Sequence, residues 1–206
     1  MNKINYYFIL PSILFSPLLF AGKVNVELKF DKRPPTAGIF YAMGSKPTAK
    51  NGVLDQKNKE FTSSIVVTDN EGSLTFKNTD DVDHNIFAND RSSGVEFDVG
   101  LMPTGTTNKL DVDWKKDTLV RLGCKIHPRM RAYIANINSD SYKVFEFDRD
   151  KTEYAAEIDN VDDSTSQFRF MFGNFDPVEV EVKKGESKTI PLTKRGKEAG
   201  SAKISR

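Results

Sequence analysis

The residue types best suited to chemistry in this chain gather in one short stretch. It holds the single cysteine, Cys124, and one of only two histidines, His127, with Met130 three residues further on. The second histidine, His84, lies well upstream. Two imidazoles, a thiolate and a thioether are the ligand set of a mononuclear type 1 copper site, where a His₂Cys plane is completed by a weak axial Met. We therefore predict one copper ion held by His84, Cys124, His127 and Met130.

The Cys-x₂-His-x₂-Met spacing places three of these side chains on one loop. A tight loop between two strands can turn the thiolate and the imidazole inward, and a rigid β scaffold then fixes the distances between the ligands. His84 has to arrive from another part of the sheet. Asn85, the residue after it, is predicted to hydrogen-bond across to the ligand loop and to support the ligands from outside.

Other roles for the same residues stay open at this point. Cys124 could be an inert buried thiol, or a nucleophile with His127 as its base, although a base usually comes from a distant part of the chain. Zinc would favour a further Cys, His or carboxylate over the thioether of Met130. Copper oxidases and reductases need additional copper ligands, and the chain has only two histidines. We therefore expect a protein that is not an enzyme.

The composition suits an exported globular protein. The 206 residues are 38% hydrophobic and 11% aromatic, enough for one large domain or one medium domain with an appendage. Residues 1–21 join Lys3 to an apolar run that ends at Ala21, the pattern of a cleaved signal peptide. Pro11 and Pro17 interrupt the run, which is shorter than the ~20 apolar residues that an uncleaved anchor needs. We thus expect no membrane span after cleavage.

Charge and cysteine usage narrow the function further. Removing Lys3 with the signal peptide leaves 29 bases (30 − 1) against 29 acids, and this balance argues against nucleic-acid binding. Exported proteins usually pair their cysteines in disulfides. Cys124 has no partner within the chain, so a reactive, metal-binding or buried role is expected for it.

Apolar residues recur at every second position, which predicts strands rather than helices. Turn-forming clusters such as 68–72 and 102–105 separate these runs. No amphipathic helix longer than two turns is expected, and the fold class is all-β, a sandwich of short strands. The alternating runs are residues 24–30, 74–76, 110–114, 168–172 and 178–182.

A change in composition near residue 139 divides the chain. Residues 22–138 contain all four candidate ligands and are expected to form the copper domain. Residues 139–193 are richer in charge and are expected to form a small β-sandwich module. Residues 194–206 carry five bases and one acid without apolar periodicity, which predicts a basic flexible tail.

These motifs resemble the cupredoxins, the type 1 blue copper proteins. Asp83-His84-Asn85 together with the Cys124–Met130 loop is similar to pseudoazurin and amicyanin, and residues 53–137 look closest to the methylamine utilisation-like exported cupredoxins. The resemblance implies a cupredoxin-like Greek-key β-sandwich, one type 1 copper and periplasmic residence. It also implies a following β module similar to the carboxypeptidase regulatory type, although residues 141–193 lack its Gly-rich turn. Lys77 replaces the proline usual before the asparagine.

The function that the resemblance implies is transport of single electrons between redox partners in the periplasm. By analogy, electrons would leave through His127. Lys125, Arg129 and Arg131 would form a basic rim that steers an acidic partner protein toward it. The alternative is copper binding for sequestration, delivery or resistance, with the same four ligands. A third hypothesis, a metal-free structural β protein, predicts no stoichiometric copper uptake.

Overall fold

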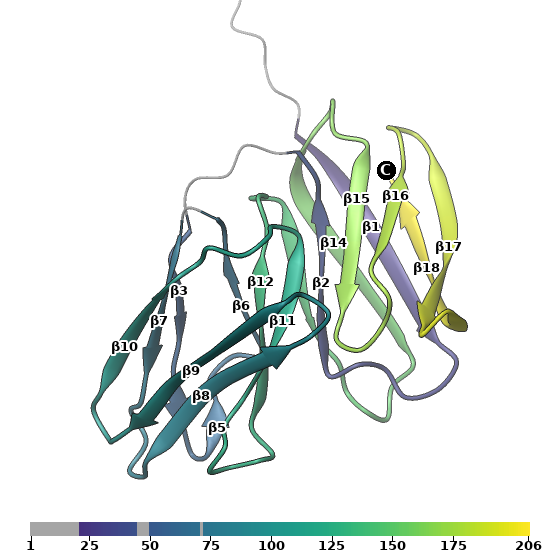
Figure 1. The fold of residues 1–206 in the computed structure, drawn as a ribbon. Coiled ribbons are helices and arrows are strands. Elements are labelled where there is room, and N and C mark those ends of the chain that lie inside the picture. The colour runs from purple at the N-terminus through teal and green to yellow at the C-terminus, as the bar shows by residue number, and fades with distance from the viewer. Residues whose placement is uncertain (1–20, 45–49, 71) are drawn as a thin grey trace, which may run out of the picture.

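The chain folds into two β-sandwiches that stand side by side (Figure 1). The computed structural model describes residues 21–44, 50–70 and 72–206, and in these ranges it contains strands and no helix. The predicted all-β class is therefore confirmed. No helix able to cross a membrane occurs within these same ranges. The predicted signal peptide, apart from Ala21, lies outside the described residues.

The first sandwich packs a five-stranded sheet, ordered β6-β12-β11-β8-β9, against a three-stranded sheet, ordered β10-β7-β3. The chain passes from β3 to β6 through the β4–β5 hairpin, and it crosses between the two sheets again after β6, β7, β9 and β10. Its strands are β3 (Gly52–Leu54), β4 (Gln56–Lys57), β5 (Glu60–Phe61), β6 (Ile65–Thr68), β7 (Ser73–Lys77), β8 (His84–Asp90), β9 (Val95–Met102), β10 (Thr107–Asp111), β11 (Thr118–Gly123) and β12 (Arg131–Asn136).

The second sandwich consists of two four-stranded antiparallel sheets, ordered β14-β1-β18-β17 and β13-β2-β15-β16. Its core is rich in phenylalanines from both sheets, among them Phe30, Phe40 and Phe170. Its strands are β1 (Ala21–Phe30), β2 (Ala37–Ala42), β13 (Tyr142–Glu146), β14 (Glu153–Asp162), β15 (Gln167–Phe172), β16 (Val178–Glu181), β17 (Ser187–Lys194) and β18 (Lys197–Ser205).

The structure corrects the predicted division of the chain. β1 and β2, assigned to the copper domain over residues 22–138, pair with strands of the second sandwich. The second sandwich is therefore not confined to residues 139–193. Its sheets need β1 and β2 as internal strands, and the apolar residues Val24, Val26 and Leu28 are buried in its core.

The flexible tail predicted over residues 194–206 is also wrong. β18 lies between β1 and β17, and Ala202 and Ile204 are fully buried in the phenylalanine-rich core. Its bases project outward, and Lys203 pairs with Glu27 of β1 at 2.8 Å. Ala202 and Ile204 are the inward-facing residues of an alternating strand pattern. The pattern is short and lies among basic residues, so it is not recognisable from the sequence alone.

An apolar seam joins the two sandwiches. β2 and β12 are buried on both faces: one face of each strand enters its own core, while Ile39 and Tyr41 of β2 meet Tyr133 and Ala135 of β12 in the seam. Strands buried on both faces lose the apolar–polar alternation of a half-exposed strand. Because packed interiors resist deformation, this seam holds one sandwich against the other.

Candidate metal centre

The candidate ligands come from two strand ends at one end of the first sandwich. His84 is the first residue of β8, and Cys124 follows the last residue of β11. The β11 residues Leu122 and Gly123 pair with Ala88 and Phe87 of β8, so the two strands are hydrogen-bonded neighbours. His84 and Cys124 are distant in sequence, and the pairing of β8 with β11 brings them together.

The loop from Cys124 to Met130 is closed by a turn. The backbone nitrogen of Met130 donates to the carbonyl of His127 at 2.9 Å. Pro128 occupies the second position of this four-residue turn, where its fixed φ is favourable. β12 starts at Arg131, directly after the loop. The predicted ligand loop is therefore a short connection between two paired strands.

Three donor atoms converge at the centre. The Cys124 Sγ lies 3.9 Å from the Nδ1 of His84 and 3.9 Å from the Nδ1 of His127, and the two Nδ1 atoms are 3.1 Å apart. Metal–nitrogen bonds of about 2.0 Å and metal–sulfur bonds of about 2.3 Å place ligand atoms about 3–4 Å from one another. The spacing and chemistry of the donors thus fit a soft or borderline metal ion.

Burial differs among the three residues. His84 is fully buried and Cys124 is 3% exposed, whereas His127 is partly exposed at the surface. Burial and the neighbouring His84 lower the pKa of His127, which favours the neutral imidazole that metals bind. Of these three candidate ligands, His127 is the one nearest to solvent.

Asp80 orients the buried histidine. Its Oδ2 lies 2.8 Å from the Nε2 of His84 and accepts a second hydrogen bond, of 2.7 Å, from the backbone nitrogen of Lys59. The Lys59 amide and the His84 ring hold the pKa of Asp80 far below its usual range. A charged carboxylate at Nε2 keeps the proton on that nitrogen and leaves Nδ1 free to bind a metal.

Asp80 is not evident from the sequence alone as a support for the site. A signal was present, because an acidic residue four positions before a candidate ligand is well placed to orient it. Its role became evident only from the contact between its carboxylate and the far side of the His84 ring.

Asn85 makes the hydrogen bond expected of it. Its Oδ1 accepts from the backbone nitrogen of Lys125 in the ligand loop at 3.3 Å, and its Nδ2 donates to Asp98 and to the carbonyl of Gly100. The Lys125 ammonium in turn forms a salt bridge with Asp98. Lys125 is therefore paired with an acidic residue, and the basic rim around His127 stays a prediction.

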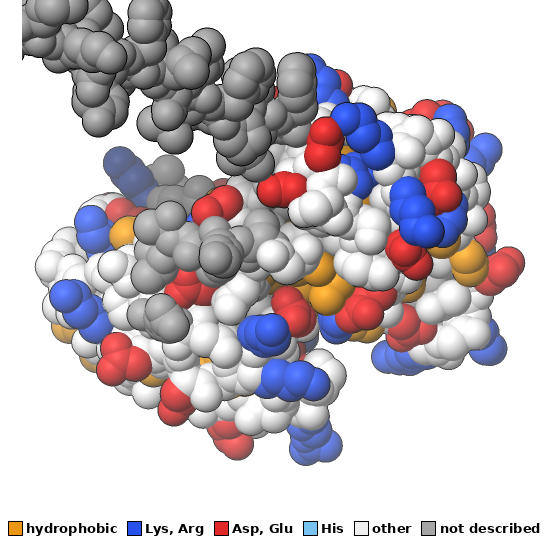
Figure 2. All heavy atoms as spheres, turned by 90° about the horizontal axis from the view of Figure 1, so that it is seen from above, with side chains coloured by type: hydrophobic (Ala, Val, Ile, Leu, Met, Phe, Trp, Pro, Cys, Tyr) orange, Lys and Arg blue, Asp and Glu red, His pale blue; other side chains and the backbone are white. Residues whose placement is uncertain are grey.

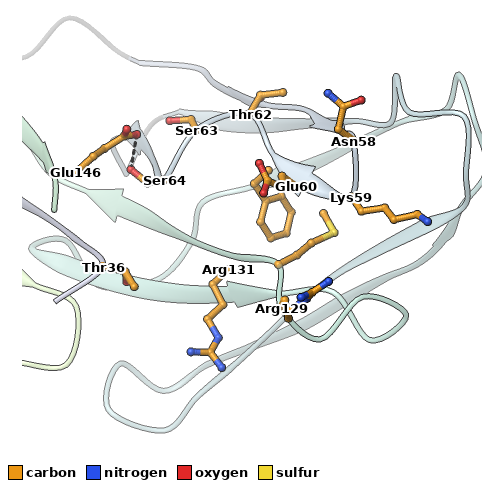
Figure 3. Close-up of a pocket in the computed structure, with 12 residues that line it drawn as sticks. Thr36, Asn58, Lys59, Glu60, Thr62, Ser63, Ser64, Arg129, Arg131 and Glu146 are labelled. Carbon is orange, nitrogen blue, oxygen red and sulfur yellow. Dashed lines mark hydrogen bonds between the residues drawn. The ribbon is translucent and has the colours of Figure 1, made fainter. Parts of the chain in front are cut away.

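Met130 is 3% exposed at the end of the ligand loop. It lines a cleft of about 730 Å³ between the loop and residues 58–64 (Figure 3). A second buried thioether, Met102, faces His84 in the β8–β9 pairing, but its sulfur already accepts from Gln56 Nε2 at 3.6 Å. The role of Met130 as the axial ligand stays a prediction from the spacing.

Comparisons with known proteins return structural likeness only. No protein-family model and no curated protein sequence matches the chain. A purple cupredoxin from Nitrosopumilus maritimus is 16% identical, with 42% of this chain and 97% of that chain covered and a TM-score of 0.35. Amicyanin from Paracoccus versutus is 15% identical, with 48% of this chain and 96% of that chain covered and a TM-score of 0.36.

A third similar structure is the copper-containing nitrite reductase from Thermus scotoductus. It is 17% identical, with 47% of this chain and 24% of that chain covered and a TM-score of 0.38. At such low identity and TM-score, none of these proteins assigns a function to this chain.

Proposed function

We propose that this protein is a periplasmic type 1 copper protein that carries single electrons between redox partners and is not itself an enzyme. The observation that carries the proposal is the convergence of the Cys124 sulfur and the two imidazole Nδ1 atoms, all within 4.8 Å of one another. Met130 would supply the weak fourth bond. A bound copper ion would accept and release one electron.

The ligands' surroundings support a carrier with a rigid site. The Nε2 of His84 is fixed by Asp80, and the ligand loop is tied to β8 by Asn85. Electron transfer is fast when the ligand shell barely moves between the two oxidation states, and such a shell needs support from outside. In this chain, Asp80 and Asn85 supply that support.

The surface near His127 supports docking of a partner protein there. Ile126 is 46% exposed, and Leu101, which pairs with Asn85, is 61% exposed. Exposed apolar side chains beside a site are typical of interaction surfaces. Arg129 and Arg131 would favour an acidic partner, and the signal-like residues 1–21 favour residence in the periplasm.

The direct test is the spectrum of the copper-loaded protein. Copper(II) bound by a cysteine thiolate absorbs visible light intensely, so the reconstituted protein should be strongly coloured with one copper per chain. Cys124→Ala should abolish the colour, and Ser93→Ala, a change in the β8–β9 connection, should leave it intact. A colourless wild-type complex would refute the type 1 assignment.

Copper sequestration or delivery is the competing function with the same ligands. A carrier of copper should pass the ion quickly to a chelating acceptor, while an electron carrier should retain it in both oxidation states. Measuring Cu(I) and Cu(II) affinities together with transfer rates separates the two. Rapid loss of the ion in either state would favour delivery.

A further inference from the structure

A second cleft lies where the two sandwiches meet, beside the first residue after the ligand loop. It has a volume of about 430 Å³, within the range of small-molecule sites. Five of its ten lining residues are basic and none is acidic. The basic residues are Arg33, Arg121, Arg131, Arg149 and Lys194.

Both sandwiches contribute to this basic cleft. Arg121 lies opposite Tyr133 in the β11–β12 pairing, and Arg131 lies two residues before Tyr133, so all three share the outer face of the first sandwich. Arg33 and Arg149 come from connections of the second sandwich. In Figure 3 the Arg131 side chain points away from Thr62 and Ser63, which line the neighbouring cleft.

The floor of the cleft is fixed. Pro34 and Pro35 are buried, and Tyr133 is 8% exposed and packs in the apolar seam. The Tyr133 hydroxyl lies 3.3 Å from the Oγ1 of Thr36, which ties the two sandwiches together at this point. Basic groups from both sides are therefore held near one another by the packed seam rather than by a single mobile loop.

The bases of the cleft have no acidic counterpart. Within the described ranges, none of the five forms a salt bridge. Asp90 does approach Arg121, but it accepts from the backbone nitrogen at 3.2 Å. On the upper end of the molecule, drawn in Figure 2, basic and acidic side chains are interspersed. Like charges gathered without counter-charge repel one another, and a bound anion would relieve that repulsion.

The kind of base is as informative as the charge. The chain has 9 arginines and 21 lysines, yet four arginines and one lysine line the cleft. A generally basic surface would follow the overall excess of lysine. Arginine presents a planar fork that binds carboxylate or phosphate oxygens through two parallel hydrogen bonds. The predominance of arginine in the cleft therefore favours specific binding of oxyanions over non-specific electrostatic attraction of anions.

We propose that the cleft between the sandwiches binds a small multivalent oxyanion, a polycarboxylate or polyphosphate, through Arg33, Arg121, Arg131 and Arg149. Each sandwich supplies two of the four guanidinium groups. The second sandwich thereby completes a ligand site that the first sandwich alone would lack. This binding does not depend on copper, so it stands or falls separately from the electron-carrier function.

The test is calorimetric titration of the metal-free full chain at constant ionic strength, because both probe anions chelate metals. Tricarballylate represents the polycarboxylates and pyrophosphate the polyphosphates. We expect saturable binding of at least one of them with one site per chain. Arg33→Gln combined with Arg149→Gln should weaken it by about tenfold or more, because charge-assisted hydrogen bonds are lost.

Two further double variants separate specific recognition from overall charge. Arg33→Lys with Arg149→Lys keeps both charges but removes the forks, and should weaken binding by about threefold or more. Arg91→Gln with Lys143→Gln removes two charges from exposed positions outside the cleft and should leave binding unchanged. Unchanged urea midpoints in all variants would show that folding is preserved.

Several outcomes would overturn the proposal. Absence of saturable binding of both anions would do so, as would full affinity in the Arg33→Gln and Arg149→Gln variant. An equal loss in the control variant would reduce the effect to net charge. Binding of an acidic peptide such as hexaglutamate, with neither small anion bound, would instead make the cleft a protein-docking surface.

Discussion

The two sandwiches bury different kinds of side chain. Among the described residues, the buried polar side chains all lie between positions 56 and 139, in or beside the first sandwich, and include Asn78, Asp80 and His84. The core of the second sandwich is wholly apolar and contains eight phenylalanines. Burying polar groups is unfavourable unless each is hydrogen-bonded, whereas burying aromatic rings is strongly favourable. The first sandwich thus holds a positioned site, and the second contributes stability.

The largest effect expected from this contrast is in the phenylalanine core. The Phe172 ring makes edge contacts with Phe30, Phe145, Phe147 and Phe170, the last at 5.4 Å between centroids. Phe172→Ala should lower the free energy of unfolding by about 3–5 kcal/mol in urea titrations. The copper spectrum of the folded variant should be unchanged. A stability loss below about 1 kcal/mol, or an altered spectrum, would break the division of roles between the sandwiches.

The second prediction addresses the polar side of the contrast. Asp80→Ala removes the carboxylate that orients His84 and should lower the copper affinity by about 10–100-fold, measured by competition with a chelator. The matched control is Asp81→Ala, because Asp81 is the exposed neighbour of Asp80 and no hydrogen bond or ion pair between its side chain and His84 is described. Equal affinities in the wild type and Asp80→Ala would show that the carboxylate does not act on the site.

The third prediction concerns the seam between the sandwiches. The Tyr41 hydroxyl donates to the Asp117 carboxylate at 2.8 Å. Burial is the main cause of the raised pKa of Tyr41, and the hydrogen bond to Asp117 is the second cause. Tyr41→Phe should cost about 1 kcal/mol of unfolding free energy, the usual net value of such a bond. Tyr142→Phe, whose hydroxyl makes no described hydrogen bond, should change stability by less than about 0.5 kcal/mol. Similar losses in both variants would argue against a role for the Tyr41–Asp117 bond.

The smallest effect is expected at the edge of the second sandwich. Asp176 accepts hydrogen bonds from Gly196, Thr193 and Arg195 at the β17–β18 turn, and these bonds lower the pKa of Asp176. A lowered pKa in the folded state means that the stabilisation is present above the unfolded pKa of about 4 and is lost as the pH falls through the folded value.

The comparison of Asp176→Asn with the wild type tests this assignment. The variant should be slightly less stable at pH 7, and the difference should shrink as the pH is lowered from about 5 to about 2 in thermal unfolding scans. A difference that stays constant over this range would mean that the charge on Asp176 does not contribute. Acidic residues elsewhere affect both proteins alike and cancel in the comparison.

Much of the candidate site was predictable because rare residue types formed it. With one cysteine and two histidines, few ligand combinations exist, and the structure brings His84, Cys124 and His127 together. Asp80 could not be singled out in the same way, since the chain has 29 acidic residues and only folding shows which one faces a given ring. The basic cleft was likewise beyond prediction, because its arginines come from four separate segments.

The sequence by itself determined the all-β class and the chemistry of the ligand set. Period-two patterning depends on local residues, and the spacing of Cys124, His127 and Met130 is fixed along a single loop. Only the tertiary structure decided which strands share a sheet. A strand such as β1 or β18 shows the same alternation in either sandwich, and closing a longer connection costs little extra entropy. Its partner is therefore selected by non-local packing, which placed both strands in the second sandwich and formed the cleft between the two.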